Sequence, residues 1–278
     1  MYFHYTTIES EENKFMKNYI LVFTGTGNSL HLANEISIHI DNVEILPIQA
    51  GIAIPTLKPA ASIGIIFPVF FMDAPGLVKT YLSQLQIEAN IDTYIYSVAT
   101  CGRYPGNALA SIRKILQSKD AGLNFAMPFI MPDSIPFPEF IKMQAKTRQQ
   151  QESRYKEQFK RLIAAISARK HKKASPMLPP VTLIAHIRSK NVSNFDENFA
   201  VTDKCISCGI CAKVCGANNI TITNEGDYPQ FNHNCAACMA CFNYCPQDAI
   251  SYKNHNQEWF QYNNPNLKLS RRLGFYEK

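Results

Sequence analysis

The placement of the cysteines constrains this chain more than any other feature. Of its nine cysteines, eight lie between Cys205 and Cys245, in a chain of 278 residues. A secreted disulfide scaffold instead spreads its cysteines along a short chain behind a signal peptide. Residues 1–18 contain three glutamates and lack the apolar core of such a peptide. The cysteines therefore predict metal ligation in a reducing compartment, which we expect to be the cytoplasm.

The eight cysteines form two copies of one run. Within each copy, two residues separate the first three cysteines, and three residues precede the fourth. This is the spacing of bacterial 4Fe–4S ferredoxins, in which the fourth cysteine binds the other cluster of the pair. It predicts two 4Fe–4S clusters with crossed ligand sets, one of Cys205, Cys208, Cys211 and Cys245 and the other of Cys235, Cys238, Cys241 and Cys215.

Structural zinc is the alternative interpretation of the cysteines, because Cys-x2-Cys pairs also bind zinc. Zinc sites usually combine two such pairs across a loop, and a triple run with a fourth cysteine fits them poorly. The segment resembles the two-cluster bacterial-type ferredoxins, although Gly216 stands where proline usually follows the fourth cysteine. Strand-like residues follow each run, at 219–222 and 249–252. Such clusters carry single electrons at potentials anywhere from roughly −700 to +450 mV.

The N-terminal half alternates between short apolar runs and segments of helical periodicity. Short continuous apolar runs are typical of parallel strands that are buried on both faces. Five strands joined by helices predict an α/β domain with a parallel sheet and helices on both faces. The expected strands are 19–23, 43–48, 63–67, 94–100 and 125–130, and the expected helices are 29–40, 77–85 and 108–117.

A glycine-containing loop separates the first strand from the first helix. Its two glycines allow a tight turn, and the free N–H groups of a helix N-terminus bind phosphate. The loop lacks the Gly-Lys-Ser/Thr of a Walker A motif and the third glycine of a dinucleotide fingerprint. It therefore favours a monophosphate, with a plain strand–helix turn as the alternative. Its residues are Thr24, Gly25, Thr26, Gly27, Asn28 and Ser29.

With this loop in this position, the chain resembles the flavodoxins, whose corresponding loop holds the FMN phosphate. The resemblance implies strand order 2-1-3-4-5 and places two further loops beside the flavin ring. We expect Phe70, Phe71 or Tyr104 to stack on the flavin, and Cys101 to be a small loop residue rather than a redox-active thiol. The further candidate FMN contacts are Pro68, Val69, Phe70, Phe71, Thr100, Cys101, Gly102, Arg103, Tyr104 and Gly106.

The whole chain resembles a family of flavodoxin–ferredoxin fusions found in anaerobic bacteria and archaea. About two domains are also expected from the length, at roughly 150 residues each. The resemblance implies a flavodoxin-like FMN-binding domain at 16–175 and a small α+β ferredoxin-like two-cluster domain at 189–255. Prolines mark 176–188 as a linker. Residues 1–15 are expected to be a disordered extension, unless translation starts at Met16, and 256–278 a polar tail.

One long basic helix is predicted over residues 139–173. Apolar side chains recur along it at helical spacing, and five basic residues, 169–173, would complement the helix dipole at its end. Residues 142–173 carry eleven Lys and Arg against two Glu. A solvated face is the simpler interpretation, and a docking surface for an acidic redox partner protein is the other. The sequence leaves open whether the chain forms a homodimer.

Composition excludes several classes of protein. With 46% hydrophobic and 18% charged residues, the chain can build a core and is not disordered. Its longest apolar stretch, 63–72, falls short of the ~20 residues that span a bilayer. The net charge is +6, but aromatic residues are not interleaved with the basic ones, which argues against nucleic-acid binding.

These features predict an electron-transfer flavoprotein that passes single electrons between two 4Fe–4S clusters and a bound FMN. The alternative is an FMN-dependent reductase of a small acceptor, with the clusters as an internal relay. Arg103 is the one charged candidate beside the expected flavin, and no catalytic residue can be assigned. A redox sensor is a third interpretation. No NAD(P)H-binding domain is recognisable, so we expect no rapid direct reduction by NADPH. The sequence does not identify the physiological donor or acceptor.

Overall fold

A central parallel sheet organises the first half of the chain. The computed structural model describes residues 16–88, 92–134, 148–224, 226–253 and 261–276, so the expected extension 1–15 lies outside it. The five strands follow the order β2-β1-β4-β6-β7, which confirms the predicted 2-1-3-4-5 topology. They are β1 (Lys17–Val22), β2 (Val43–Pro47), β4 (Ala60–Pro68), β6 (Tyr94–Cys101) and β7 (Phe125–Ile130). Two short strands, β3 (Thr56–Leu57) and β5 (Gln86–Ile87), pair with each other.

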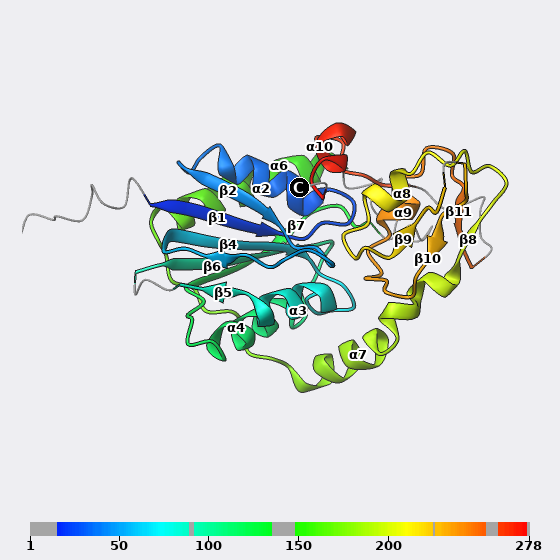
Figure 1. Cartoon of the computed structure of the whole chain (residues 1–278). Coiled ribbons are helices and arrows are strands. Elements are labelled where there is room, and N and C mark those ends of the chain that lie inside the picture. The colour runs from blue at the N-terminus through cyan, green and yellow to red at the C-terminus, as the bar shows by residue number, and fades with distance from the viewer. Residues whose placement is uncertain (1–15, 89–91, 135–147, 225, 254–260, 277–278) are drawn as a thin grey trace, which may run out of the picture.

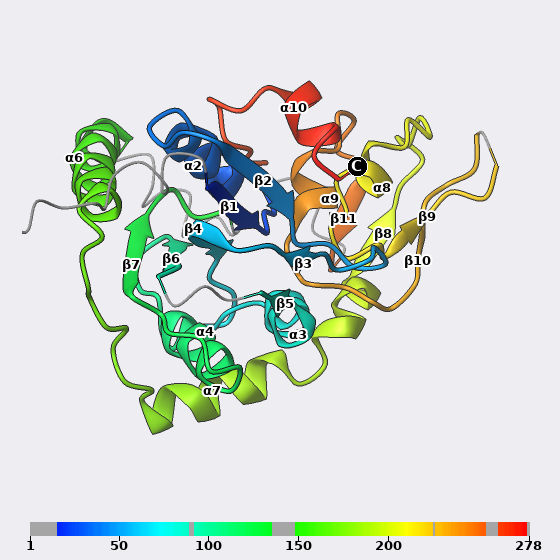
Figure 2. The same ribbon diagram turned by 60° about the vertical axis from the view of Figure 1, so that its left-hand side comes forward.

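Helices cover both faces of this sheet (Figures 1 and 2). On one face lie α2 (Asn28–Ser37) and α6 (Arg148–Ser167), and on the other lie α3 (Gly76–Gln84) and α4 (Ala108–Gln117). The central strands β4 and β6 are buried almost throughout, as strands covered on both faces must be. In the described part of the chain, no helix has the length and apolar composition to cross a bilayer.

The basic helix ends earlier than its sequence predicts. Helix α6 stops at Ser167, and residues 139–147 lie outside the described residues. Arg169 adopts a left-handed φ of 45°, which turns the chain out of the helix. Lys172 then pairs with the edge of β7, donating to the carbonyl of Asn124 and accepting from the N–H of Ala126. The prediction that residues 169–173 form the helix C-terminus is therefore wrong, because pairing at the sheet edge outweighs the dipole interaction.

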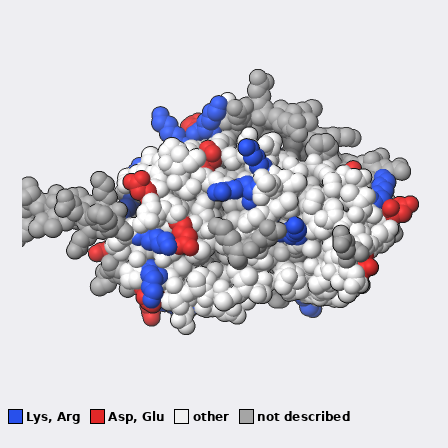
Figure 3. Space-filling model, turned by 45° about the horizontal axis from the view of Figure 1, so that its top comes forward, with Lys and Arg blue, Asp and Glu red and all other residues white. Residues whose placement is uncertain are grey.

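Charged groups on the surface are interspersed rather than gathered by sign. On the face drawn in Figure 3, Lys and Arg side chains alternate with Asp and Glu, and much of the area is uncharged. On α6 itself, Arg154, Lys156 and Lys160 are exposed, and Arg161 pairs with Glu157 at 2.9 Å. The basic surface of α6 is thus a local feature of one helix.

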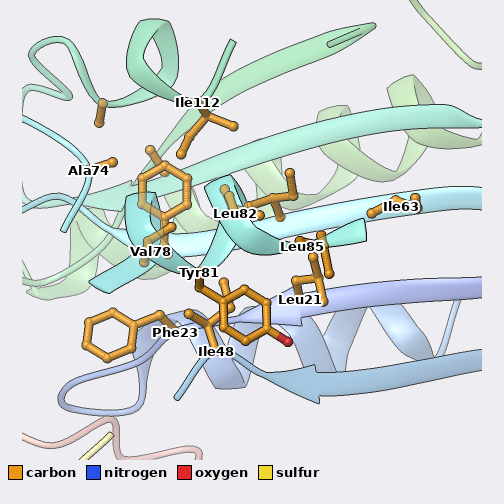
Figure 4. Packing of buried hydrophobic residues seen from close by; sticks show 14 of the residues in the cluster. Leu21, Phe23, Ile48, Ile63, Ala74, Val78, Tyr81, Leu82, Leu85 and Ile112 are labelled. Atoms are coloured by element: carbon orange, nitrogen blue, oxygen red, sulfur yellow. The ribbon is translucent and has the colours of Figure 1, made fainter. Parts of the chain in front are cut away.

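A hydrophobic core fixes α3 against the sheet (Figure 4). Val78, Leu82 and Leu85 pack against Leu21 and Ile63 of the strands, and all five are at most 1% exposed. Burying such side chains stabilises the fold by about 1.5–3 kcal/mol each. This packing holds the carboxyl ends of β1 and β4 in place, and both strands lead into the site loops.

The segment expected to be a linker contains a helix, α7 (Pro179–Ser189). Two prolines occupy its first turn, where their fixed φ suits a helix and their missing N–H groups cost nothing. Asn107 anchors this helix, because its side chain donates to the hydroxyl of Thr182 at 2.7 Å and accepts from the N–H of Leu178 at 3.0 Å. Helix α7 runs along the outside of the molecule to the second domain (Figures 1 and 2).

The second domain is small and contains two two-stranded antiparallel sheets. Strand β11 pairs with β8, and β10 pairs with β9, so strands lie within both strand-like segments expected after the cysteine runs. Around the cysteines, the apolar core includes Phe199, Ile220 and Phe242. The elements are the 3₁₀-helix η1 (Val192–Asn198), β8 (Phe199–Val201), α8 (Ile210–Lys213), β9 (Ile220–Thr221), β10 (Gln230–Phe231), α9 (Ala240–Asn243) and β11 (Ile250–Tyr252).

The described part of the expected tail is packed between the two domains. It contains the short helix α10 (Leu269–Leu273), and Asn264, Arg272 and Tyr276 are buried. The N–H of Asn264 donates to the carbonyl of Thr26 at 2.9 Å. The tail has no periodicity in its sequence because long-range contacts, rather than one amphipathic face, hold it in place.

Candidate cofactor sites

The loop at residues 24–29 has the geometry of an anion site. Gly27 takes a left-handed φ of 98° immediately before α2, and its N–H donates to the Thr24 hydroxyl at 3.2 Å. Within the described residues, no side chain caps α2, so its first N–H groups are available to a ligand. Thr24, Thr26 and Ser29 are at most 4% exposed, so hydroxyls sit inside the loop.

Side-chain hydrogen bonds tie this loop to its surroundings. The Ser29 and Thr100 hydroxyls lie 2.9 Å apart, which joins the loop to the end of β6. The Asn28 amide donates to the carbonyl of Pro132 at 2.9 Å. Its oxygen accepts from the Tyr262 hydroxyl at 2.8 Å and from the Asn264 amide at 2.9 Å. The loop is therefore held in one conformation from three directions.

A cavity of about 690 Å³ opens beyond the carboxyl ends of the strands. This position is where ligands bind in open α/β sheets, and the volume suits a cofactor. Of the sixteen residues expected to contact FMN, Gly27 and Gly106 do not line it. The others do, namely Thr24, Gly25, Thr26, Asn28, Ser29, Pro68, Val69, Phe70, Phe71, Thr100, Cys101, Gly102, Arg103 and Tyr104.

Gly106 has a different role. It adopts a left-handed φ of 55°, and a Cβ at this position would clash with the backbone carbonyl of Met72. The N–H of the next residue, Asn107, donates to that same carbonyl at 2.8 Å. Gly106 therefore lets the loop after β6 approach the loop after β4, so that both reach the cavity.

A strained turn presents two of the candidate stacking residues. Phe70 and Asp73 exchange backbone hydrogen bonds of 3.0 and 2.9 Å. The two residues between them, Phe71 and Met72, have positive φ values of 51° and 64°, as in type I′ turns. Such a conformation costs non-glycine residues on the order of 1–3 kcal/mol each, and strain of this kind clusters at functional sites. Asp73 supports the turn, because one of its oxygens accepts from the Ser111 hydroxyl at 2.6 Å.

Cys101 and Tyr104 differ in their exposure within the cavity wall. Cys101 is buried, and burial raises the pKa of its thiol to about 12. A thiol with so high a pKa stays protonated near neutral pH and is a poor nucleophile. Tyr104 is 48% exposed and lies at the rim.

Ten lining residues were not among the expected FMN contacts. Pro132, Asp133 and Ser134 follow β7, and the rule that ligands bind at the carboxyl ends of strands could have suggested them. Met72 belongs to the turn just described. The rest come from α7 and the second domain. Cys238 was expected only as a cluster ligand, and no local signal connects any of these residues to the cavity: Arg188, Phe195, Ala237, Cys238, Met239 and Tyr252.

The structure gathers the eight cluster cysteines into two groups. The two groups are those that the crossed spacing predicts, with the fourth cysteine of each run joining the other run. One cavity is lined by Cys205, Cys208, Cys211 and Cys245, hereafter site I. A second is lined by Cys215, Cys235, Cys238 and Cys241, hereafter site II.

The two sites are related by internal symmetry. In both runs the first cysteine sulfur accepts from the N–H two residues on, and the fourth from the N–H four residues on. Such hydrogen bonds to sulfur help to set cluster potentials. The donors are Ser207 and Asn219 in the first run and Ala237 and Ala249 in the second, at 3.4, 3.3, 3.2 and 3.2 Å.

The chemistry of the donors fits iron–sulfur clusters. Burial raises the pKa of Cys211 and Cys238 to about 11 and that of Cys235 to about 12. Thiolates in such surroundings need a compensating positive charge, which bound iron supplies. In the described ranges, no three His, Cys, Asp or Glu side chains are grouped so as to hold a single metal ion.

The sites differ in their exposure and in their neighbours. Site I lies near the surface, with Cys208 exposed and Ile206 beside it 61% exposed. At site II, Cys238 and Cys241 are buried, and Cys238 also lines the 690 Å³ cavity. Cys211 of site I is near enough to raise the pKa of the Cys241 thiol. Surface, site I, site II and the cavity therefore follow one another in space.

Comparisons with known proteins found one family model and, among solved structures, a flavodoxin. A family model described as a 4Fe-4S dicluster domain matches residues 204–250. None of the curated proteins compared with this chain matches it. Among solved structures, two-electron reduced flavodoxin from Megasphaera elsdenii matches 43% of this chain and 90% of its own, with 16% identity and a TM-score of 0.32. The chain thus joins a ferredoxin-like dicluster domain to a domain whose strand order is that of flavodoxins.

Proposed function

We propose that this protein transfers single electrons between two 4Fe–4S clusters and a bound FMN. One observation carries the proposal: Cys238 lines both site II and the large cavity. A cluster ligand and a cofactor would then share a wall without intervening protein. When bound, FMN accepts one or two electrons, whereas each cluster passes one at a time.

The residues that would hold FMN divide by chemistry. The backbone and hydroxyls of residues 24–29 would bind the phosphate. The ring would lie between the loops after β4 and β6, where Phe71 from the first domain faces Phe195 from the second at 6.4 Å between ring centroids. Phe195 stacks on Tyr252 at 5.4 Å, and both line the cavity. These aromatic side chains would exclude water from the ring.

The composition of the natively loaded protein tests this proposal. Anaerobic purification followed by iron, sulfide and acid-released flavin analysis should give about eight irons and one FMN per chain. Eight irons without flavin would refute the flavin half and leave a ferredoxin with a cavity for another ligand. Two zinc ions in place of iron would refute the cluster half.

The partner would be a redox protein with an acidic surface that docks on α6. Gln158 of this helix exchanges hydrogen bonds with the backbone of Ile130, two residues before Pro132 in the cavity wall, so α6 adjoins the cavity. Figure 2 places α6 far from α8 and α9, and a partner bound there would therefore reach the FMN site rather than the clusters. Association through α6 should slow as ionic strength rises, and a rate independent of salt would contradict it.

A reductase acting on a small acceptor is the second candidate. Three charged side chains outside the loop at residues 24–29 line the cavity, namely Arg103, Asp133 and Arg188. Such groups could orient a polar acceptor. Turnover of an acceptor with reduced ferredoxin as donor, lost in Arg103→Ala at unchanged flavin content, would support this function. The absence of turnover with every oxidant tested would leave electron transfer as the function.

A further inference from the structure

A positive charge is buried between the two proposed cofactor sites. Arg272 of α10 is fully buried. Its Nη2 donates to the carbonyl of Val214 at 2.7 Å and to those of Thr24 and Gly25 at 3.3 Å each. The guanidinium also lies over the ring of Tyr276, at 4.6 Å from the centroid.

Among the described residues, no carboxylate pairs with this charge. None of the ion pairs within the described residues involves Arg272, and the Tyr244 hydroxyl near its guanidinium is a neutral group, because burial raises the pKa of that tyrosine. A guanidinium cannot lose its proton in a protein. A buried charge without a partner is strongly unfavourable, so the surroundings must supply negative charge when the molecule is loaded.

Site II and the phosphate loop supply that charge from two sides. The carbonyl of Val214 belongs to the residue before Cys215, and a Cβ on Gly25, whose carbonyl also accepts from Arg272, would lie 2.6 Å from the carbonyl oxygen of Cys238. The other two carbonyls that accept from Arg272, those of Thr24 and Gly25, belong to the loop at residues 24–29, which is the proposed phosphate loop. Because a trans peptide directs its N–H opposite to its C=O, these bonds turn the N–H groups of Gly25 and Thr26 away from Arg272.

We propose that Arg272 is the shared counter-cation of the site II cluster and the phosphate loop, and that it raises the reduction potential of the site II cluster above that of site I. Reduction adds one electron, and hence one negative charge, to a cluster that four thiolates already make negative. A fixed cation nearby stabilises the added charge. Its carbonyl acceptors on Val214 and Gly25 adjoin Cys215 and Cys238, which both belong to site II, so its effect is greater at that cluster. This inference rests on the proposed function.

Potentiometric titration of the full-length holoprotein, followed by electron paramagnetic resonance, tests it. In Arg272→Gln, one of the two cluster potentials should fall by ~59 mV. For a one-electron couple, this shift lowers the ratio of reduced to oxidised cluster about tenfold at a given applied potential. The other potential should shift less, and Arg272→Lys should retain most of the wild-type value. Arg271→Gln removes the same charge from an exposed neighbouring position and is the matched control. Unchanged potentials in Arg272→Gln, or equal shifts in both Gln variants, would overturn the inference.

A second variant covers the case in which Arg272→Gln does not assemble. Replacement of Arg272 by citrulline keeps the shape and the planar donors but removes the charge. The same tenfold fall at one cluster would support the role as counter-cation, and wild-type potentials would reject it. Wild-type protein without cluster iron would instead refute the proposed function, and this inference with it.

Discussion

The carbonyl oxygen of Cys238 lies 2.6 Å from the position that a Cβ on Gly25 would occupy. A residue of the phosphate loop and a cysteine of site II are therefore in backbone contact across the domain boundary. Real Cβ atoms do not approach an oxygen this closely, so any side chain at residue 25 must push the two loops apart.

Alanine at this position should slow electron exchange between flavin and clusters. Because electron transfer between two cofactors slows as the distance between them grows, we expect Gly25→Ala to slow reoxidation of photoreduced flavin by the clusters. Flash photolysis measures this rate. Gly122→Ala is the control, since within the described residues a Cβ there meets no atom within 4 Å. Equal rates in both variants would show that the contact does not carry the electron.

Removing the Ser29 hydroxyl should weaken flavin binding. Its partner, Thr100, lies 2.9 Å away, and a net hydrogen bond contributes about 0.5–1.5 kcal/mol. We expect the Kd of FMN for Ser29→Ala to rise by about 2- to 12-fold in a titration of flavin fluorescence. Ser83→Ala removes an exposed hydroxyl on α3 that donates to the carbonyl of Thr80. It should leave the Kd unchanged, and a Kd for Ser29→Ala equal to that of this control would reject the role of Ser29.

Two double variants distinguish crossed from uncrossed cluster ligation. Cys205 and Cys245 share site I, whereas Cys215 belongs to site II. The pair Cys205→Ser and Cys245→Ser should therefore leave one cluster, with about four irons per chain. The pair Cys205→Ser and Cys215→Ser should damage both. If ligation followed the order of the sequence instead, the iron contents of the two proteins would be exchanged.

His31 should make stability fall at acidic pH. Burial lowers the pKa of this imidazole below its ordinary 6.5, and the ring stacks on Tyr155 at 5.8 Å. As the pH falls, the unfolded chain therefore binds this proton at a higher pH than the folded chain does. The contribution of His31 is complete above pH 6.5 and is lost as the pH falls, by at most about 1.4 kcal/mol per unit for one proton.

Urea unfolding between pH 8 and pH 5 measures this dependence. His31→Gln should unfold with a shallower dependence on pH than the wild type. The exposed His186→Gln on α7 should keep the wild-type slope. The same slope in both variants would assign the pH dependence to other groups.

Local sequence determined most of the sheet domain. Helix α4 and strand β7 have the bounds that their apolar patterns predict, because a buried parallel strand needs a continuous apolar run and a covering helix needs a stripe. The end of α6 could not be predicted in the same way. Its basic run suits a helix terminus as well as an exposed sheet edge, and the edge strand β7 decides between them.

The residues of the candidate sites also differ in whether local sequence could predict them. Residues 24–29 and the cysteine runs carry their own chemistry in contiguous sequence, so both could be proposed as sites before the fold was known. Phe195, Met239 and Tyr252 line the cavity because the second domain docks on the first. Arg272 lies between the two sites for the same reason. Docking depends on complementary surfaces, which no local sequence pattern predicts.

The contacts from Arg272 to the phosphate loop also set an order of events during translation. Thr24 precedes Arg272 by 248 residues, which corresponds to roughly ten to fifty seconds of synthesis at typical rates. For that time the ribosome presents a sheet domain whose phosphate loop still lacks its partners Asn264, Arg272 and Tyr276. If the loop needs these partners to bind FMN, as the proposed function implies, flavin loading would wait until the cluster domain has emerged. A nascent chain would then not hold a reactive flavin before it has the means to discharge it.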